Sequence, residues 1–235
     1  MKLCVIGTSH LGALKLGWDL VRDQFAAHEL VFFGSPGSSL RQTRVRNGIL
    51  VPIDQGLSKS FEYTSGGLNE INPDLYDGFI VYGLMQKLPR LRRGISKAVM
   101  QATMKDIAEK GLALKIATRL RSATDKRMWL GANPMVLALD GEVEPGTFYA
   151  YDALLNQLQR NFAVKDAEFL PQPAETMGSD LRTAVRFGGG SVRLLPRKDD
   201  SQVSHPDDDE KHMNGTYGRL WLLRNLPAIV QGVPS

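Results

Sequence analysis

The sequence predicts an α/β fold, a three-layer sandwich with a central, mostly parallel sheet. Short apolar runs that end in glycine-containing turns alternate with longer segments whose apolar residues have helical spacing. A buried parallel strand is apolar along its whole length, because helices cover both faces of its sheet. Strands that alternate with helices indicate parallel strands joined by helical crossovers.

The strand pattern occurs first at residues 3–6, where an apolar run ends at Gly7. Comparable runs end at Gly34, Gly83 and Gly131. The main predicted strands are 3–6, 30–33, 79–82, 127–130 and 167–170. Two further short strands are predicted at 49–53 and 61–64.

Helical spacing follows most of these strands. Helices are predicted over 9–21, 95–122, 149–162 and 215–226, with an interruption near Gly111 and a stop at Pro227. Residues 171–211 are rich in Pro, Gly, Ser and Asp, and we expect an irregular excursion there. A length of 235 residues is ordinary for one α/β domain. We therefore expect residues 1–235 to form a single domain.

The composition is that of a soluble globular protein, with 43% hydrophobic and 23% charged residues. No apolar run reaches the ~20 residues that span a bilayer. The apolar run at the N-terminus is too short for the core of a signal peptide, so we expect a cytoplasmic location. Cys4 is the only cysteine, which excludes an internal disulfide and argues against a cysteine metal site. We expect neither a metal nor a cofactor.

The positive charge is concentrated in one segment. Residues 87–127 hold 12 Lys or Arg against Asp106, Glu109 and Asp125, a net charge of 12 − 3 = +9, whereas the remainder of the chain is net negative. One interpretation is a long helical connection with a solvated basic face. The other is a wall or lid that attracts an anionic substrate. Nucleic acid is not an expected partner, because no binding motif accompanies the charge.

Ser9 follows the first strand, in the turn 7–12 that leads into a helix. A hydroxyl at that point is exposed at the carboxyl edge of the sheet, close to helix-start amides that stabilise an oxyanion. By position alone Ser9 is better explained as a helix N-cap, which serine favours. The turn lacks the spacing of a phosphate loop or of a dinucleotide-binding loop.

Asp209 precedes His212 by three residues, just before the last predicted helix. An aspartate on such a turn can orient an imidazole and fix its tautomer, so that the other ring nitrogen is free to take a proton from a serine. The alternatives are a solvated polar loop or a weak cation site, because Asp207, Asp208 and Asp209 are consecutive.

Taken in chain order, these two motifs resemble the SGNH (GDSL-like) hydrolase superfamily. In that family the nucleophilic serine follows the first strand, and an Asp-x-x-His motif precedes the last helix. The resemblance implies a flavodoxin-like sheet, with Ser9 as nucleophile, His212 as base and Asp209 as its orienter. Asn214 and Gly215, which follow the histidine, also look like the family's closing motif.

The middle motifs depart from the family pattern. The glycine after the second strand is Gly34 or Gly37. Gly83 is placed like the glycine of the family's Gly-x-Asn-Asp motif, but no asparagine follows it. The resemblance therefore implies that the side-chain amide donor of the oxyanion hole is either lost or supplied by Gln86 or by Asn133, which lies one strand later. We expect Gly34, Gly83 and Asn133 to bind the oxyanion or the substrate, with the backbone amides of Ser9 and of a glycine turn as oxyanion donors.

These residues together predict a serine ester hydrolase that acts through an acyl-enzyme on an O-acyl ester, such as an O-acetyl ester of a carbohydrate. An acyltransferase that modifies a glycan with the same site is the first alternative. A catalytically weak binding or assembly module is the second, favoured by the missing asparagine. The expected partner is a small-molecule or glycan ester, which the basic segment suggests is anionic. The sequence does not set the oligomeric state.

Overall fold

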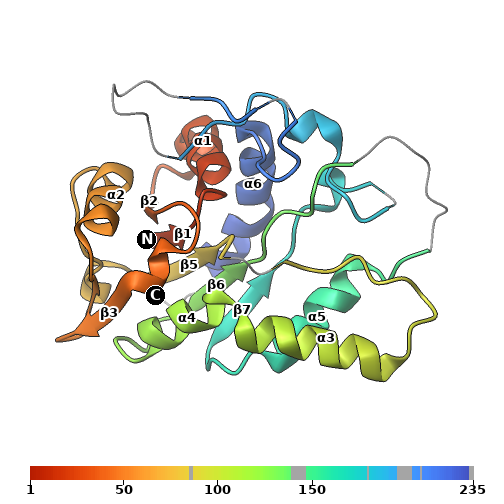
Figure 1. Cartoon of the computed structure of the whole chain (residues 1–235). Coiled ribbons are helices and arrows are strands. Elements are labelled where there is room, and N and C mark those ends of the chain that lie inside the picture. Colours follow the sequence, from red (N-terminus) through yellow and green to blue (C-terminus); the bar gives the residue numbers. More distant parts are fainter. Residues whose placement is uncertain (85–86, 139–146, 179, 195–202, 207, 233–235) are drawn as a thin grey trace.

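Five parallel strands form the central sheet, in the order β2-β1-β5-β6-β7. The computed structural model describes residues 1–84, 87–138, 147–178, 180–194, 203–206 and 208–232 (Figure 1). The strands are β1 (Lys2–Gly7), β2 (Glu29–Gly34), β5 (Gly78–Tyr82), β6 (Met128–Gly131) and β7 (Ala167–Leu170). The predicted α/β class and the five main strands are confirmed.

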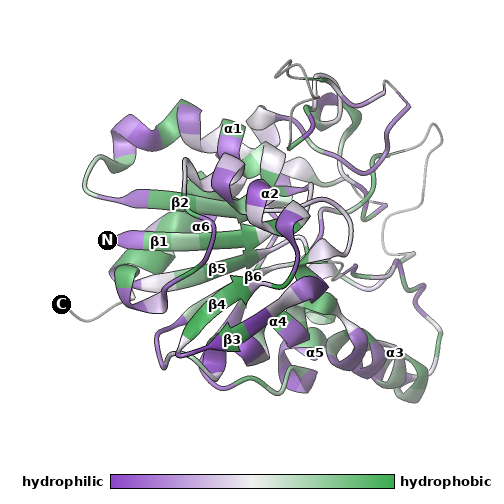
Figure 2. Cartoon of the chain, turned by 60° about the vertical axis from the view of Figure 1, so that its left-hand side comes forward, coloured by the Kyte–Doolittle hydropathy of each residue, from purple (hydrophilic) through white to green (hydrophobic). Residues whose placement is uncertain are grey.

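Helices cover both faces of the sheet. Helices α1 (Leu11–Val21) and α6 (Gly215–Gln231) pack on one face. Helices α2 (Gln55–Ser65), α3 (Lys97–Lys110), α4 (Leu112–Arg121) and α5 (Tyr151–Asn161) belong to the core of the other face. Alternate side chains of the strands enter the two cores. This two-sided burial explains why the strands of the sheet are mostly hydrophobic (Figure 2).

The remaining elements are short. Strands β3 (Thr43–Arg46) and β4 (Ile49–Pro52) form a separate antiparallel pair, and β4 matches the strand predicted at 49–53. The 3₁₀ turns are η1 (Arg22–Phe25), η2 (Ser39–Gln42), η3 (Pro73–Leu75), η4 (Ala174–Thr176) and η5 (Val185–Phe187). Within the described ranges, no helix has both the length and the apolar character needed to cross a membrane.

The strand order places a crevice at the carboxyl end of β1. The connection after β1 leads to β2 on one side, and the later strands add on the other side, beginning with β5. In open α/β sheets, ligands bind where the strand order reverses in this way, outside the carboxyl ends of the strands. Ser9 follows β1 and Gly83 follows β5, so both lie at this point.

Two glycines allow α1 and α6 to approach closely. A Cβ on Gly17 would overlap the backbone of Gly218, and a Cβ on Gly218 would overlap the carbonyl of Ala13. Helix α1 begins two residues after Ser9, and α6 begins three residues after His212. The close contact of the two helices therefore brings Ser9 and His212 together, although they lie near opposite ends of the chain.

Two predictions about local structure were wrong. Residues 61–64 lie inside helix α2, because Asp54 caps it (Leu57 N to Asp54 Oδ1, 2.9 Å) and Leu57 and Phe61 share its buried face. Helix α6 continues past Pro227 to Gln231. Leu226 and Ile229 on either side of the proline are fully buried, and this packing maintains the helix across the missing N–H.

Candidate active site

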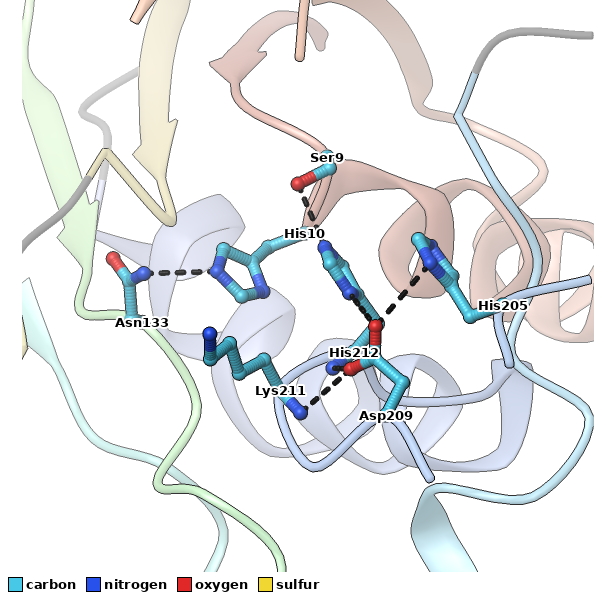
Figure 3. A network of polar contacts seen from close by, with 7 residues as sticks. All are labelled: Ser9, His10, Asn133, His205, Asp209, Lys211 and His212. Carbon is cyan, nitrogen blue, oxygen red and sulfur yellow. Dashed lines mark hydrogen bonds and ion pairs between the residues drawn. The ribbon is translucent and has the colours of Figure 1, made fainter. Parts of the chain in front are cut away.

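Ser9, His212 and Asp209 form a continuous line of hydrogen bonds (Figure 3). The distance from Ser9 Oγ to His212 Nε2 is 2.8 Å, and the distance from His212 Nδ1 to Asp209 Oδ2 is also 2.8 Å. Because the ionised carboxylate only accepts, Nδ1 carries the ring proton of neutral His212. Nε2 is then an acceptor, and it faces the serine hydroxyl.

The carboxylate of Asp209 is fixed at both oxygens. Its Oδ1 accepts the backbone N–H groups of Lys211 (2.7 Å) and His212 (2.9 Å), while Oδ2 accepts from the His212 ring. Burial raises the pKa of Asp209, but the hydrogen bonds from the His212 ring and from the two amides outweigh it and lower the pKa to about 2. Asp209 is thus held ionised and oriented toward His212.

The turn that carries these residues is anchored on both sides. The Leu137 N–H donates to the carbonyl of Glu210 at 2.8 Å. Asn214 caps α6 by accepting the Tyr217 N–H at 3.1 Å, and its side-chain amide donates to the carbonyls of Arg186 and Gly189. Part of the segment 171–211, which was predicted to be irregular, therefore helps to position His212. The composition of the segment did not indicate this role.

His212 lies between two other histidines. The ring of His205 is parallel to it, with centroids 3.8 Å apart and an interplanar angle of 4°. The ring of His10 lies on its other side, at 5.1 Å and 28°. Burial lowers the pKa of His205, and burial together with unfavourable electrostatic interactions with His212 and Lys87 lowers the pKa of His10 to about 3. Both flanking rings are therefore neutral at physiological pH.

His10 is held by Asn133 and Gly83. The side-chain amide of Asn133 donates to His10 Nε2 at 2.8 Å, which leaves the ring proton on Nδ1. Gly83 has a φ of +62°, and a Cβ there would lie 2.7 Å from His10 Cβ. The Thr8 hydroxyl donates to the Gly83 carbonyl at 2.6 Å, which joins the turns after β1 and β5.

The two predicted glycine amides are not free to bind an oxyanion. The Gly34 N–H donates to Thr64 Oγ1 at 2.9 Å, and the Gly83 N–H donates to the Gly131 carbonyl at 3.0 Å. The expectation that Gly34 and Gly83 supply amide donors is therefore corrected: their N–H groups are used within the fold. Asn133 lies beside the site, whereas Gln86 is outside the described residues.

A cavity of about 400 Å³ opens beside Ser9 and His212. Leu88, Pro134, Met135 and Val136 give it an apolar wall. Its lining also includes Gly37, Asn133 and three cationic side chains, which are Lys87, Arg90 and Lys211. Gly37, the other candidate for the second family glycine, thus lies at the cavity. The segment 134–136 carried no motif, and only its position after β6 could have indicated it.

His205, Asp209 and His212 are the described residues that come nearest to a metal centre. Their ligand atoms lie within 4.8 Å of one another. The two imidazole rings are parallel, however, so their lone pairs do not converge on one point. Both Nδ1 atoms also already face Asp209 Oδ2, at 3.4 and 2.8 Å. The geometry fits hydrogen bonding better than tetrahedral metal coordination.

Several solved structures have a similar fold, and two of them serve as examples. One is the periplasmic domain of a lipopolysaccharide acetyltransferase from Salmonella ser. Paratyphi A, with a TM-score of 0.48 and 9% identity over 97% of this chain and 83% of that chain. The other is a carbohydrate acetylesterase family member from Sinorhizobium meliloti, with a TM-score of 0.45 and 10% identity over 99% and 100%. No family model and no curated protein matches the sequence.

Proposed function

We propose that this chain is a serine ester hydrolase of the SGNH-like kind that forms an acyl-enzyme on Ser9. The observation that carries the proposal is the Ser9–His212 contact of 2.8 Å, continued to Asp209 at 2.8 Å. A serine hydroxyl is a weak nucleophile until a base takes its proton, and a base that is itself oriented by a carboxylate is the arrangement that does this. A binding module has no need of this proton path.

In the first step, Ser9 Oγ attacks the ester carbonyl while His212 Nε2 takes the serine proton. The carbonyl oxygen becomes an oxyanion, and the imidazolium is stabilised by the ionised Asp209. When the tetrahedral intermediate collapses, the C–O bond to the alcohol breaks and His212 gives its proton to the leaving oxygen. The products of this step are the alcohol and an ester on Ser9.

In the second step, water takes the part that Ser9 has in the first step. His212 takes a proton from water, the hydroxide attacks the acyl-enzyme, and His212 returns the proton to Ser9 Oγ. The proposed oxyanion donors are the Ser9 backbone N–H, in the turn just before α1, and the second N–H of the Asn133 side chain, whose first N–H is given to His10. The amides of Gly34 and Gly83 have no part in this scheme.

The test is a fluorophosphonate probe followed by peptide mapping, together with turnover of 4-nitrophenyl acetate. We expect one labelled serine, Ser9, and loss of both labelling and turnover in Ser9→Ala. His212→Ala should behave like Ser9→Ala with an unchanged melting temperature. Labelling and turnover that survive Ser9→Ala would exclude the assignment.

An acyltransferase is the second candidate, and the apolar wall formed by Leu88, Pro134, Met135 and Val136 favours it. Such a wall keeps water away from an acyl-enzyme and leaves time for another hydroxyl to react. The measurement is acceptor competition: a transferase should divert most of the acyl group to an added alcohol at millimolar concentration. If no added alcohol changes the fraction of the acyl group that is transferred to water, the enzyme is a hydrolase.

A further inference from the structure

Three cations line the cavity that contains Ser9, and none of its lining residues within the described part of the chain is acidic. Lys87 and Arg90 come from the segment after β5, and Lys211 comes from the turn between Asp209 and His212. Neither lysine forms an ion pair with any described carboxylate. The described lining of the cavity that contains Ser9 is therefore net positive.

Arg90 is held in place by its neighbours. Its Nε donates to the Asp180 carbonyl at 2.8 Å, its guanidinium lies 3.6 Å from the Asp180 carboxylate, and it packs over the ring of Phe148 at 4.4 Å. Arg182 shares the same carboxylate at 3.4 Å. Two guanidinium groups thus face one carboxylate, and one positive charge remains without a partner beside the cavity.

The cavity lining has few uncharged polar side chains, and two of them already form hydrogen bonds within the protein. Thr8 gives its hydroxyl to the Gly83 carbonyl, and Asn133 gives an amide hydrogen to His10. Most of the remaining wall is apolar. A neutral sugar ring needs many hydrogen-bond partners to replace its water, and this cavity offers few of them. A negatively charged group with an apolar neighbour fits the lining better.

We propose that the ester attacked by Ser9 carries a carboxylate or phosphate group, bound by Lys87, Arg90 and Lys211, next to an apolar portion that contacts the segment 134–136. This inference rests on the proposed ester hydrolase function and names its substrate class. The positive charge of Lys87 also contributes to the lowered pKa of His10, which lines the same cavity. The anion is bound away from the bond that breaks, so it should act mainly through KM.

Three acetate esters with the same acyl group form the kinetic test: 4-tolyl acetate, 4-acetoxybenzoate and 4-acetoxyphenyl phosphate. We expect kcat/KM for both charged esters to exceed that for the neutral ester by about tenfold at low salt, and the ratio to fall as salt rises. The larger of the two ratios identifies carboxylate or phosphate as the preferred anion. A ratio near one for both charged esters would overturn the inference while leaving the hydrolase intact.

In the variant Lys87→Met/Lys211→Met, the ratio of kcat/KM for a charged ester to kcat/KM for the neutral ester should fall most of the way to one. The cause should be a higher KM for the charged esters. Lys97→Met/Lys115→Met is the matched control, because these two lysines are exposed on the same basic segment and lie outside the cavity. The control should keep the full ratio. An equal loss in both variants would mean that general surface charge is responsible, and it would overturn the proposed site.

Binding to Ser9→Ala separates this inference from the proposed function. Calorimetry with phenyl phosphate and benzoate should show binding that weakens with salt and is lost in Ser9→Ala/Lys87→Met/Lys211→Met. Anion binding without ester turnover in the unmodified protein would exclude the hydrolase and retain the anion site. Absence of anion binding would exclude the anion site, whatever the turnover.

Discussion

The imidazole rings of His205 and His212 lie parallel, 3.8 Å apart, and both present Nδ1 to the same oxygen of Asp209. His205 thus covers the face of His212 that is opposite to His10 and shares the carboxylate that orients it. The His205 Nε2 atom is buried and has no hydrogen-bond partner among the described residues. The orientation of the His205 ring therefore depends on the ring stack and on Asp209.

We expect His205 to position His212 for the reaction. His205→Ala should lower kcat by ~10- to 100-fold with little change in KM, because an imidazole that is free to tilt spends less time aligned with Ser9. His205→Phe preserves the stack and should restore most of kcat, whereas His205→Asn should not. Steady-state kinetics of the three variants check this, and a normal kcat in His205→Ala would assign the ring a purely structural role.

Asp209→Asn should retain the fold and lose the reaction. The asparagine oxygen can still accept the two backbone N–H groups of the turn. Its NH₂ group then faces His212 Nδ1, which favours the tautomer with the proton on Nε2, and that tautomer cannot accept from Ser9. We expect kcat to fall by ~10³- to 10⁴-fold with the melting temperature nearly unchanged. An activity loss below tenfold would remove Asp209 from the proton path.

Part of this site could be predicted from the sequence because it depends on local geometry. Ser9 directly follows a strand, and Asp209 reaches His212 within one turn, so few residues determine each position. The contact of His205 depends instead on the path of the irregular segment before Asp209, which has no periodicity to predict it. The Gly83 N–H is not free, because it donates a hydrogen bond to the Gly131 carbonyl at the end of the β5–β6 pair. No local sequence motif specifies this hydrogen bond between two strands.

In the fold, too, features set by local sequence could be predicted, whereas features set by packing between distant residues could not. The main strands are apolar runs bounded by turns, and their burial on both faces makes them visible in the sequence. The aromatic and β-branched residues at 61–64 resemble a strand, but the Asp54 cap and the burial of Leu57 favour a helix. Pro227 would end an exposed helix, whereas the packing of α6 against α1 and the sheet overrides that preference.

Gly83→Ala should reduce both stability and activity. The positive φ alone costs an alanine about 1 kcal/mol, or ~2–4 °C in melting temperature for a chain of this size. The new Cβ would also push against His10, and through it against His212. Gly48→Ala is the matched control, since Gly48 has a φ of +77° and no atom within 4 Å of the added Cβ. Only Gly83→Ala should lower kcat; equal kcat in both variants would separate Gly83 from the site.

Folding stability should fall as the pH is lowered through the range in which unfolded histidine titrates. The pKa of His10 is about 3 in the folded chain against an ordinary 6.5, so below 6.5 the unfolded state binds a proton that the folded state excludes. The His10 contribution is fully present above pH 6.5 and is lost progressively down to about 3. At pH ~4.5 this loss amounts to about 3 kcal/mol.

Urea unfolding at pH ~7 and ~4.5 measures this effect, with His10→Gln as the comparison. The glutamine has no titrating group, so the variant should lose about 3 kcal/mol less stability than the unmodified chain over this interval. His205, whose pKa is also lowered, adds a loss of the same sign to both proteins. Identical pH dependence in the two proteins would show that His10 is protonated as easily in the folded state as in the unfolded one.

Asn133 has two possible routes to the reaction, and a double-mutant cycle with His10 separates them. If Asn133 donates to the oxyanion, Asn133→Ala should lower kcat by ~10²-fold or more, in the unmodified chain and in His10→Gln alike. If Asn133 acts only by holding His10, its effect should largely disappear in the His10→Gln background, because the partner that it positions is already gone. We expect the first result, since the Asn133 amide has a second N–H and lines the cavity. Additive losses in the double variant would support the donor role, and a double variant no worse than His10→Gln would assign Asn133 to positioning alone.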